Sequence, residues 1–135
     1  MAEGGVVKPL GNYAKVQRAN GLLYVAGTTA RQADGTIAGV TTGAHGRRTP
    51  DVGAQTRFAL QAIRDILRSE GADLEDCVDI TVFLTDMATF AQFNTAYAEF
   101  FDRDPPTRTT VGVTALPHPD MAVELKAIAL CASRN

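Results

Sequence analysis

The chain is organised around the stretch Pro105-Pro106-Thr107-Arg108-Thr109-Thr110-Val111-Gly112-Val113, which predicts a strand that begins beside a positive charge. The two prolines fix φ and end the helical pattern that precedes them. Five of the seven residues at 107–113 are β-branched, which favours a strand. Alternation along a strand then groups Arg108, Thr110 and Gly112 on one face, where the glycine lets another group approach the backbone.

Arg108 is the first candidate for a functional residue. The planar fork of a guanidinium pairs bidentately with a carboxylate, and hydroxyls or strand N–H groups can complete such a site. The same arginine could instead pair with a surface acid, because a single arginine in a strand is a weak signal. The pattern therefore indicates a small-carboxylate site and leaves the surface ion pair open.

Length and charge limit the class of protein. The 135 residues, of which 45% are hydrophobic, suffice for one core, so we expect a single domain over residues 1–135 with a loose lead-in at 1–10. Thirteen Lys and Arg against fifteen Asp and Glu, a formal net charge of -2, argue against nucleic acid or a membrane surface as the main partner. The sequence has no apolar run of the roughly 18 to 20 residues that cross a bilayer and no basic-then-apolar start, so we expect a cytoplasmic protein.

The two cysteines, Cys77 and Cys131, are far apart and lie in or beside apolar strand patterns. We expect buried thiols rather than a disulfide, a metal site or a nucleophile. The sequence also lacks the His and Cys spacings of metal sites and the glycine-rich loop of phosphate sites. We therefore expect neither a metal nor a cofactor.

The remaining pattern predicts alternating strands and helices. An Asn20-Gly21 turn joins strands at 13–18 and 22–26, and residues 28–49 follow as a loop with at most one short strand, near 36–40. Thr49-Pro50-Asp51 opens a helix that Thr49 caps and that runs to about Glu70. The later elements are a strand at 78–85, a helix at 88–101 whose aromatic stripe we assign to core packing, and strands at 107–113 and 122–131.

Glu124 is the second unusual residue, because it lies between Val123 and Leu125 in the last strand. It could form an ion pair with Lys126, or with Arg108 on what we take to be the neighbouring strand. It could instead be held near a ligand to orient a water, with its pKa set by partial burial. Both interpretations place Glu124 on the polar side of the sheet.

Together these elements predict an α+β fold with a mixed sheet, whose two crossover helices lie on the same face if each connection is right-handed. The other face would be bare and would carry Arg108, Thr110 and Glu124 beside apolar residues such as Ile128 and Leu130. A monomer rarely leaves such a face in water. We therefore expect a homo-oligomer with sites formed between subunits.

Eight segments between Gly11 and Ala129 resemble the RidA/YjgF/UK114 family in order and spacing. They are Gly11-Asn12-Tyr13, Val25-Ala26-Gly27, Gln55-Thr56, Ile63-Arg64-Asp65-Ile66-Leu67, residues 81–87, residues 90–101, Pro106-Thr107-Arg108-Thr109 and Val123-Glu124-Leu125. The resemblance implies a chorismate-mutase-like subunit in a homotrimer with an internal barrel and three clefts between subunits. It also implies cofactor-independent hydrolysis of imines and enamines to ketones and ammonia.

The resemblance further implies roles for individual residues. Arg108 would bind the substrate carboxylate and Glu124 would position water. The cleft would be lined by Tyr13, Gly27, Asn94 and Thr110.

Departures from the commonest family pattern narrow the resemblance. The family's Gly-Pro-Tyr is Gly11-Asn12-Tyr13 here, its Ser-Gly-Gln is Ala26-Gly27-Thr28, and the position often held by cysteine is Thr110. The segments Gly27-Thr28-Thr29-Ala30-Arg31, 65–74 and Leu116-Pro117-His118-Pro119 look more like the branch that contains 2-aminomuconate deaminase. The resemblance thus implies hydrolysis of 2-aminomuconate, an enamine of aromatic catabolism, through its imine to 4-oxalocrotonate and ammonia.

A dicarboxylate needs a second cation, and the candidates are Arg31, His118 and Lys126, with Lys15 a weaker one. Thr28 joins the expected substrate-binding residues. Two alternatives remain open: a generic 2-iminoacid deaminase, and a non-catalytic trimeric protein that binds small carboxylates. Glu124 separates these alternatives, because a carboxylate binder gains nothing from a nearby negative charge.

Overall fold

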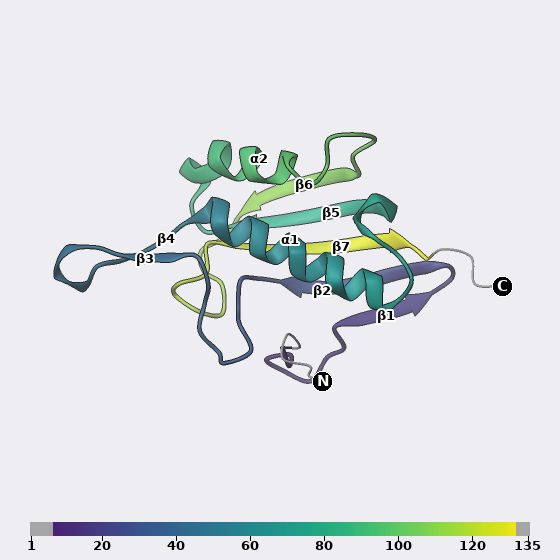
Figure 1. Ribbon diagram of the computed structural model, residues 1–135, viewed down its shortest axis with the longest axis horizontal. Helices are drawn as coiled ribbons and strands as arrows, with labels where there is room; N and C mark the ends of the chain where they lie inside the picture. The colour runs from purple at the N-terminus through teal and green to yellow at the C-terminus, as the bar shows by residue number, and fades with distance from the viewer. Residues whose placement is uncertain (1–6, 132–135) are drawn as a thin grey trace.

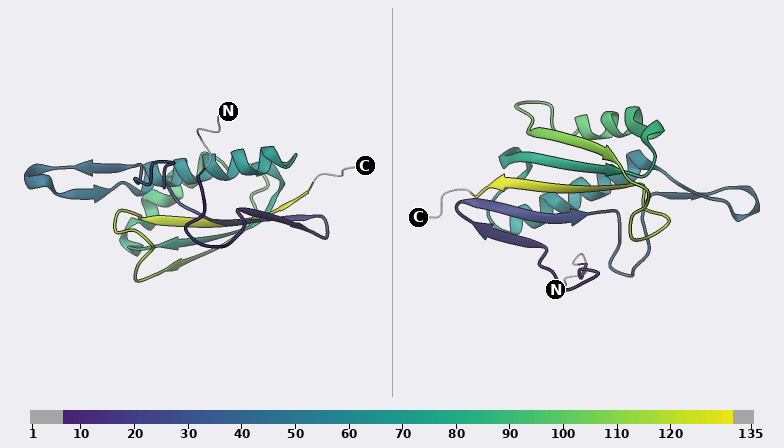
Figure 2. Two further views of the ribbon diagram at one scale, coloured as in Figure 1. Left: turned by 90° about the horizontal axis from the view of Figure 1, so that it is seen from below. Right: turned by 180° about the vertical axis from the view of Figure 1, so that it is seen from behind.

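The computed structural model describes residues 7–131, which form a five-stranded sheet with two helices packed on one face (Figure 1, Figure 2). Across the sheet the strands follow the order β1 (Val16–Ala19), β2 (Leu22–Thr28), β7 (Val123–Leu130), β5 (Cys77–Leu84) and β6 (Thr107–Gly112). Strands β5 and β6 pair in parallel and the other neighbours are antiparallel. The mixed sheet and the α+β class that the sequence predicts are confirmed.

The core lies between the sheet and α1 (Val52–Ser69). Leu60, Ile63 and Leu67 recur on one side of this helix and are fully buried, each contributing about 1.5–3 kcal/mol relative to exposure. The cap of α1 is Asp51, whose side chain accepts from the backbone N–H of Ala54, and not Thr49 as predicted. Thr49 is unavailable because its backbone belongs to strand β4 (Arg48–Pro50).

The second helix is shorter than the predicted residues 88–101. A 3-10 turn at Met87–Thr89 leads into α2 (Phe90–Ala98), and Asp86 caps that turn through the N–H of Ala88. At the other end, Phe100 donates to the carbonyl of Tyr97 at 3.0 Å, a short-range bond that tightens the last turn and ends the helix.

The loop predicted at residues 28–49 contains a hairpin instead. Strands β3 (Val40–Thr42) and β4 are joined by a 3-10 turn at Ala44–Gly46, and the hairpin projects beyond the sheet (Figure 1). The short strand expected near 36–40 is reduced to one bridge between Arg31 and Ile37. The prediction was wrong because both strands are three residues long and largely exposed, so no buried face marks them in the sequence.

The predicted bare face exists, but Arg108 and Thr110 do not lie on it. In the parallel pair they stand opposite Ile80 and Val82, which are fully buried beneath the helices. Glu124 stands opposite Phe83 and lies on the uncovered face. Alternation shows which residues share a face, and it does not show which face meets the helices. The uncovered face also carries Tyr24, Val111 and Leu130, which are 38%, 40% and 53% exposed.

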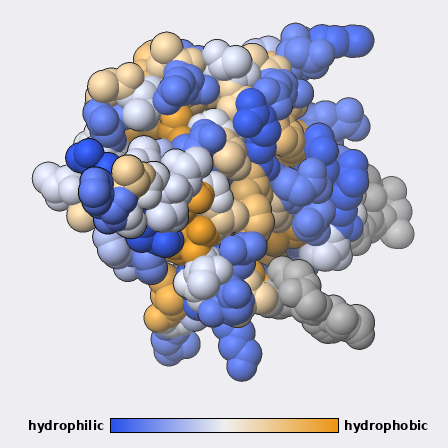
Figure 3. Space-filling view, turned by 60° about the vertical axis from the view of Figure 1, so that its left-hand side comes forward, coloured by the Kyte–Doolittle hydropathy of each residue, from blue (hydrophilic) through white to orange (hydrophobic). Residues whose placement is uncertain are grey.

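Apolar surface also reaches solvent on the side from which the hairpin projects, where it lies between polar regions (Figure 3). Within residues 7–131, no helix combines the length and the hydrophobicity that crossing a membrane requires.

Candidate functional site

The guanidinium of Arg108 lies against three aromatic rings of α2. Its Cζ is 5.7 Å from the ring centre of Phe90, 5.2 Å from that of Phe93 and 4.7 Å from that of Tyr97. Spacings of three and four residues bring these rings to one side of the helix, where it passes β6. A cation within about 6 Å of an aromatic face is attracted by the ring electrons. The aromatic stripe therefore supports a charge as well as packing the core.

No ion pair among residues 7–131 involves Arg108, so the surface acid left open as its partner is not found there. The hydroxyls of two neighbouring residues, Tyr97 and Thr110, are buried without a hydrogen-bond partner. Asn94 is half-buried on α2 and follows Phe93, as expected for the edge of the stripe. Arg108, near the start of β6, therefore has a guanidinium that forms no ion pair with an acid among the described residues.

A second polar group forms where β2 meets β7. The carboxylate of Glu124 covers the backbone of Gly27 so closely that a Cβ added there would lie 1.8 Å from Oε2. The register shift between Val25 and Thr28 accompanies this contact. A side chain at position 27 would therefore have to displace the Glu124 carboxylate.

Burial raises the pKa of Glu124 above its usual value. The ion pairs with Lys126 and Arg108 that the sequence left open are not formed within residues 7–131. Lys126 instead lies over the ring of Tyr24, with Nζ 5.9 Å from its centre, and β5 separates β7 from the strand of Arg108. A desolvated carboxylate with a raised pKa is a stronger base than a solvated one once it is ionised.

Arg108 and Glu124 do not belong to one cluster of a single chain. They lie on opposite faces of the sheet, on strands separated by β5. A molecule small enough to be held by Arg108 cannot also touch Glu124 of the same chain. The chain therefore carries two separate polar half-sites.

Several other predicted residues gather beside Gly27. The backbone carbonyl of Lys15 accepts from Ala26, and burial and the nearby charge of Arg31 together lower the pKa of Lys15. Arg31 donates to the carbonyl of Lys8 at 2.8 Å. Two cations therefore lie close to each other at the end of β2.

Tyr13 and Thr28 also belong to this part of the chain. Tyr13 is 50% exposed in the segment before β1, and its hydroxyl accepts weakly from the N–H of Leu10 at 3.4 Å. The Thr28 hydroxyl is already engaged, because it donates to the carbonyl of Ala26 at 2.9 Å. Of the two, Tyr13 is the more available to a ligand.

His118 lies away from Arg108, in the loop beyond the opposite end of β6. Its Nδ1 accepts from the N–H of Asp120 at 3.0 Å, which leaves Nε2 as the donor. The imidazole lines a cavity of about 170 Å³ with Thr85 and Thr114 among its neighbours. The structure thus does not bring His118 and Arg108 of one chain together.

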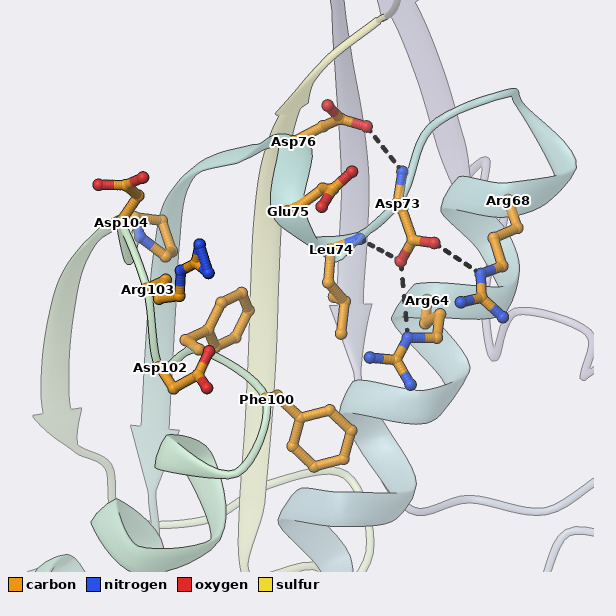
Figure 4. A pocket seen from close by; sticks show the side chains of 12 residues that line it. Arg64, Arg68, Asp73, Leu74, Glu75, Asp76, Phe100, Asp102, Arg103 and Asp104 are labelled. Carbon is orange, nitrogen blue, oxygen red and sulfur yellow. Dashed lines mark hydrogen bonds and ion pairs between the residues drawn. The ribbon is translucent and has the colours of Figure 1, made fainter.

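A cavity of about 740 Å³ is lined by none of the predicted site residues (Figure 4). It lies between the C-terminal half of α1, the Leu74–Asp76 turn and the loop after α2. Its arginines are largely engaged: Asp73 binds Arg68 at 2.7 Å and lies 3.5 Å from Arg64. Phe101 in its wall packs against Tyr97, with ring centres 4.7 Å apart, so the cavity begins beyond the aromatic support of Arg108.

The sequence interpretation missed the aromatic rings as functional residues. The signal was present, since the stripe ends a few residues before the two prolines and Arg108, and such a short connection keeps helix and strand side by side. Cys77 is a buried free thiol whose pKa burial raises to about 12, as expected of a packing residue. Among residues 7–131, no three His, Cys, Asp or Glu side chains gather as ligands for a metal.

Comparison with known proteins agrees with this fold over most of its length. A RutC family protein of Pyrococcus horikoshii is 36% identical over 122 residues, which cover 90% of this chain and 89% of that protein. The structure of a Mycobacterium tuberculosis member of the YjgF/YER057c/UK114 family is 32% identical and covers 87% of this chain and 86% of its own, with a TM-score of 0.71. The structure of E. coli TdcF with bound serine is 27% identical and covers 96% of this chain and 95% of its own, with a TM-score of 0.77.

A family model described as Endoribonuclease L-PSP matches residues 5–131, nearly the whole sequence. The resemblance noted in the sequence is therefore confirmed at the level of the family, and the match leaves the 2-aminomuconate branch as a proposal. This chain belongs to the RidA/YjgF/UK114 family, the family of the Endoribonuclease L-PSP model.

Proposed function

We propose that the protein hydrolyses 2-imino acids and their enamine tautomers to 2-oxo acids and ammonia, without a metal or a cofactor. The observation that carries the proposal is the state of Arg108. Three aromatic rings hold its face, and no acid of the described chain occupies the N–H groups that would bind a carboxylate. Family membership supports the same class of chemistry or the binding of a small molecule.

The two half-sites are the basis for proposing a shared site. Arg108 and Glu124 of one chain are on opposite faces, so a site that uses both requires Arg108 from one copy and Glu124 from another. We propose the homotrimer of the family arrangement, in which the uncovered sheet faces enclose an internal barrel. Light scattering that gives a monomer at micromolar concentration would overturn this shared site.

The proposed reaction depends on moving protons from the attacking water to the imine nitrogen, with Glu124 as the base. Arg108 binds the carboxylate next to the imine carbon, and Glu124 takes a proton from water as the oxygen attacks the C=N carbon. Glu124 returns this proton to the nitrogen, which gives the carbinolamine. Transfer of the hydroxyl proton to the nitrogen then accompanies collapse to ammonia and the 2-oxo acid. Water and imine are thus converted to ketone and ammonia with no change in oxidation state.

The finer proposal is that the substrate is 2-aminomuconate, the product being 4-oxalocrotonate. Its second carboxylate needs a cation near Glu124, and the adjacent Lys15 and Arg31 are at that end of β2. His118 lies in the loop that leads into β7, at the edge of the sheet where β2 ends, so it is a further candidate. Tyr13, Thr28, Asn94 and Thr110 would line the remainder of the shared cleft.

Ammonia release tests both levels of the proposal. An amino-acid oxidase generates short 2-imino acids in place, and 2-aminomuconate is offered in a parallel assay with and without the protein. Faster ammonia release from 2-aminomuconate supports the finer substrate, while a preference for the short imine supports the generic deaminase alone. RNA is offered in a third assay, and cleavage there without ammonia from either imine would overturn the deaminase proposal.

A small-carboxylate binding protein is the second candidate, since the related TdcF structure contains bound serine. It predicts that 2-oxo acids and amino acids bind while neither imine is hydrolysed. It also predicts that Glu124→Gln tightens binding, because a negative charge near the ligand is removed, with no catalysis to lose.

A further inference from the structure

The buried hydroxyl of Tyr97, on the ring that lies against Arg108, has no hydrogen-bond partner among the residues described. Among residues 7–131, three buried side-chain polar atoms lack a hydrogen-bond partner: Arg64 Nε, Tyr97 Oη and Thr110 Oγ1. The first lies 3.5 Å from a carboxylate oxygen of Asp73. The other two both belong to residues that flank Arg108, one on the ring nearest its guanidinium and one two residues along the same strand face.

An unpaired buried hydroxyl is unfavourable, costing on the order of the desolvation of the group. Phenylalanine at position 97 would keep the ring, and with it the contacts to Phe93 and Phe101, without that cost. Phe90 and Phe93 already support the guanidinium without hydroxyls. The hydroxyl of Tyr97 is therefore better explained by a partner that enters with a ligand than by packing.

We propose that Tyr97 completes the carboxylate site of Arg108, its ring holding the face of the guanidinium while its hydroxyl donates to the carboxylate that the guanidinium binds. The inference rests on the proposed carboxylate role of Arg108 and adds a recognition residue to it. Thr110 supplies a second hydroxyl from the strand. The ligand class is that of the proposed function, a 2-oxo or 2-imino acid, whose carboxylate would accept from both hydroxyls and from the guanidinium.

The protonation of Tyr97 suits this role. Burial raises its pKa to about 12, against the opposing influence of Arg108. The phenol therefore stays protonated at neutral pH and acts as a donor. A phenolate in the same place would repel the carboxylate.

Tyr97→Phe is the decisive variant, because it removes the hydroxyl and keeps the stacked ring. Affinity is measured by NMR titration for 2-oxobutyrate and for its methyl ester, together with Tm. We expect affinity for the acid to fall at least about fivefold, ester binding to stay unchanged, and Tm to stay equal or rise. Unchanged affinity for the acid with a higher Tm would show that the hydroxyl is an unused packing defect and would overturn the proposal.

Two further variants separate hydroxyl recognition from general damage. Thr110→Val should also weaken binding of the acid, and combining it with Tyr97→Phe should give less than the product of the two effects if both hydroxyls serve one carboxylate. Thr95→Val is the control, since its exposed hydroxyl on α2 donates to Ala91 of the same helix. Equal weakening of acid and ester by Tyr97→Phe contradicts the proposal.

The proposed deaminase activity and the proposed role of Tyr97 can be refuted by different results. Wild-type protein that binds 2-oxobutyrate but releases no ammonia from imines refutes hydrolysis and leaves the Tyr97 comparison valid. Wild-type protein that binds no 2-oxobutyrate refutes the carboxylate site itself, and Tyr97 with it.

Discussion

At the scale of single residues, the sequence indicated which residues are functional candidates more readily than which face of the sheet and which contacts each of them has. Arg108 and Glu124 stood out in the sequence because each places a charge in a strand. The face of Arg108 could not be predicted, since β6 is an edge strand and both of its faces contain polar residues. The close contact of Gly27 with Glu124 depends on how β2 and β7 pair, which the sequence does not show. The sequence pattern indicated only that a glycine follows an apolar strand.

Replacing Arg108 tests the site most directly. Arg108→Ala should lower kcat/KM at least about 100-fold, and Arg108→Lys should not restore it, because an ammonium cannot reproduce the planar fork or its stacking on Tyr97. Steady-state ammonia release measures both. A loss smaller than about tenfold corresponds to under about 1.4 kcal/mol and would show that no charge-assisted bidentate contact is made.

Glu124 predicts opposite effects of pH on activity and stability. Burial raises its pKa in the folded chain, so folding is favoured by protonation of this group as pH falls through that folded pKa, whereas the base needed for hydrolysis is lost over the same range. The acid limb of the kcat profile should therefore lie above the ~4.3 of a free glutamate.

Glu124→Gln should lower kcat by roughly 100-fold while Tm at neutral pH stays equal or rises, because no ion pair is broken within residues 7–131. Thermal melts across pH 4–8 measure Tm of the wild type and the variant, and ammonia assays over the same range measure kcat. A lower Tm with full activity per folded protein would assign Glu124 a structural role.

Gly27→Ala should separate catalysis from binding at Arg108. The new Cβ would overlap the Glu124 carboxylate and force it to move. We expect kcat to fall at least about tenfold with little change in 2-oxobutyrate affinity, since misplacing a catalytic group by about 1 Å is costly. Gly21→Ala is unsuitable as a control because its φ is +78°, so Ala19→Ser, a small exposed change on the neighbouring strand β1, is the control and should leave kcat and affinity unchanged. A parallel loss of affinity would contradict the separation.

At the scale of elements, long periodic segments were predictable and short exposed ones were not. Helix α1 and strands β5 and β7 have a buried face that repeats with the right period. The β3–β4 hairpin lacks such a face, and its reversal depends on the positive φ of His45 and Gly46. A salt bridge between Arg48 and Asp120, at 2.7 Å, joins the hairpin to the loop before β7, from the strand pair next to the hairpin's turn.

Gln55 connects three elements and offers a test of the fold. It is fully buried on α1, donates to the carbonyls of Gly39 and Asp120, and accepts from the N–H of Ala122. Gln55→Leu should lower Tm on the order of 10 °C, because the N–H of Ala122 and the carbonyl of Asp120 lose this partner, whereas the carbonyl of Gly39 still accepts from Asp51. Gln61→Leu, an exposed change on the same helix, should have little effect in the same thermal melt. Equal melting of both variants would show that water replaces the lost bonds.

At the scale of the whole molecule, the uncovered sheet face and the divided site lead to the same proposal. The sequence predicted that one face would be bare, because two right-handed connections place both helices together. It could not predict that Arg108 would lie on the other face, and this division is the stronger argument for a shared site. A site assembled from two copies should be restored by mixing two different inactive variants.

Co-expression of Arg108→Ala and Glu124→Gln chains, each inactive alone, should therefore recover activity. In a random mixture three quarters of trimers contain both variants, and each of these has one intact site of three, which gives about a quarter of wild-type activity. Differently tagged chains allow the mixed trimers to be purified and assayed. No recovery in mixed trimers would show that each site uses Arg108 and Glu124 of one chain.

The placement of Arg108 and Glu124 on opposite faces of the sheet also has a genetic meaning. In the proposed trimer, loss-of-function alleles fall into two groups, one for each face, and a cell that carries one allele from each group keeps part of the function. Two alleles from the same group do not compensate for each other. Complementation in trans would then assign a new mutation to its half of the site from the growth of the cells alone.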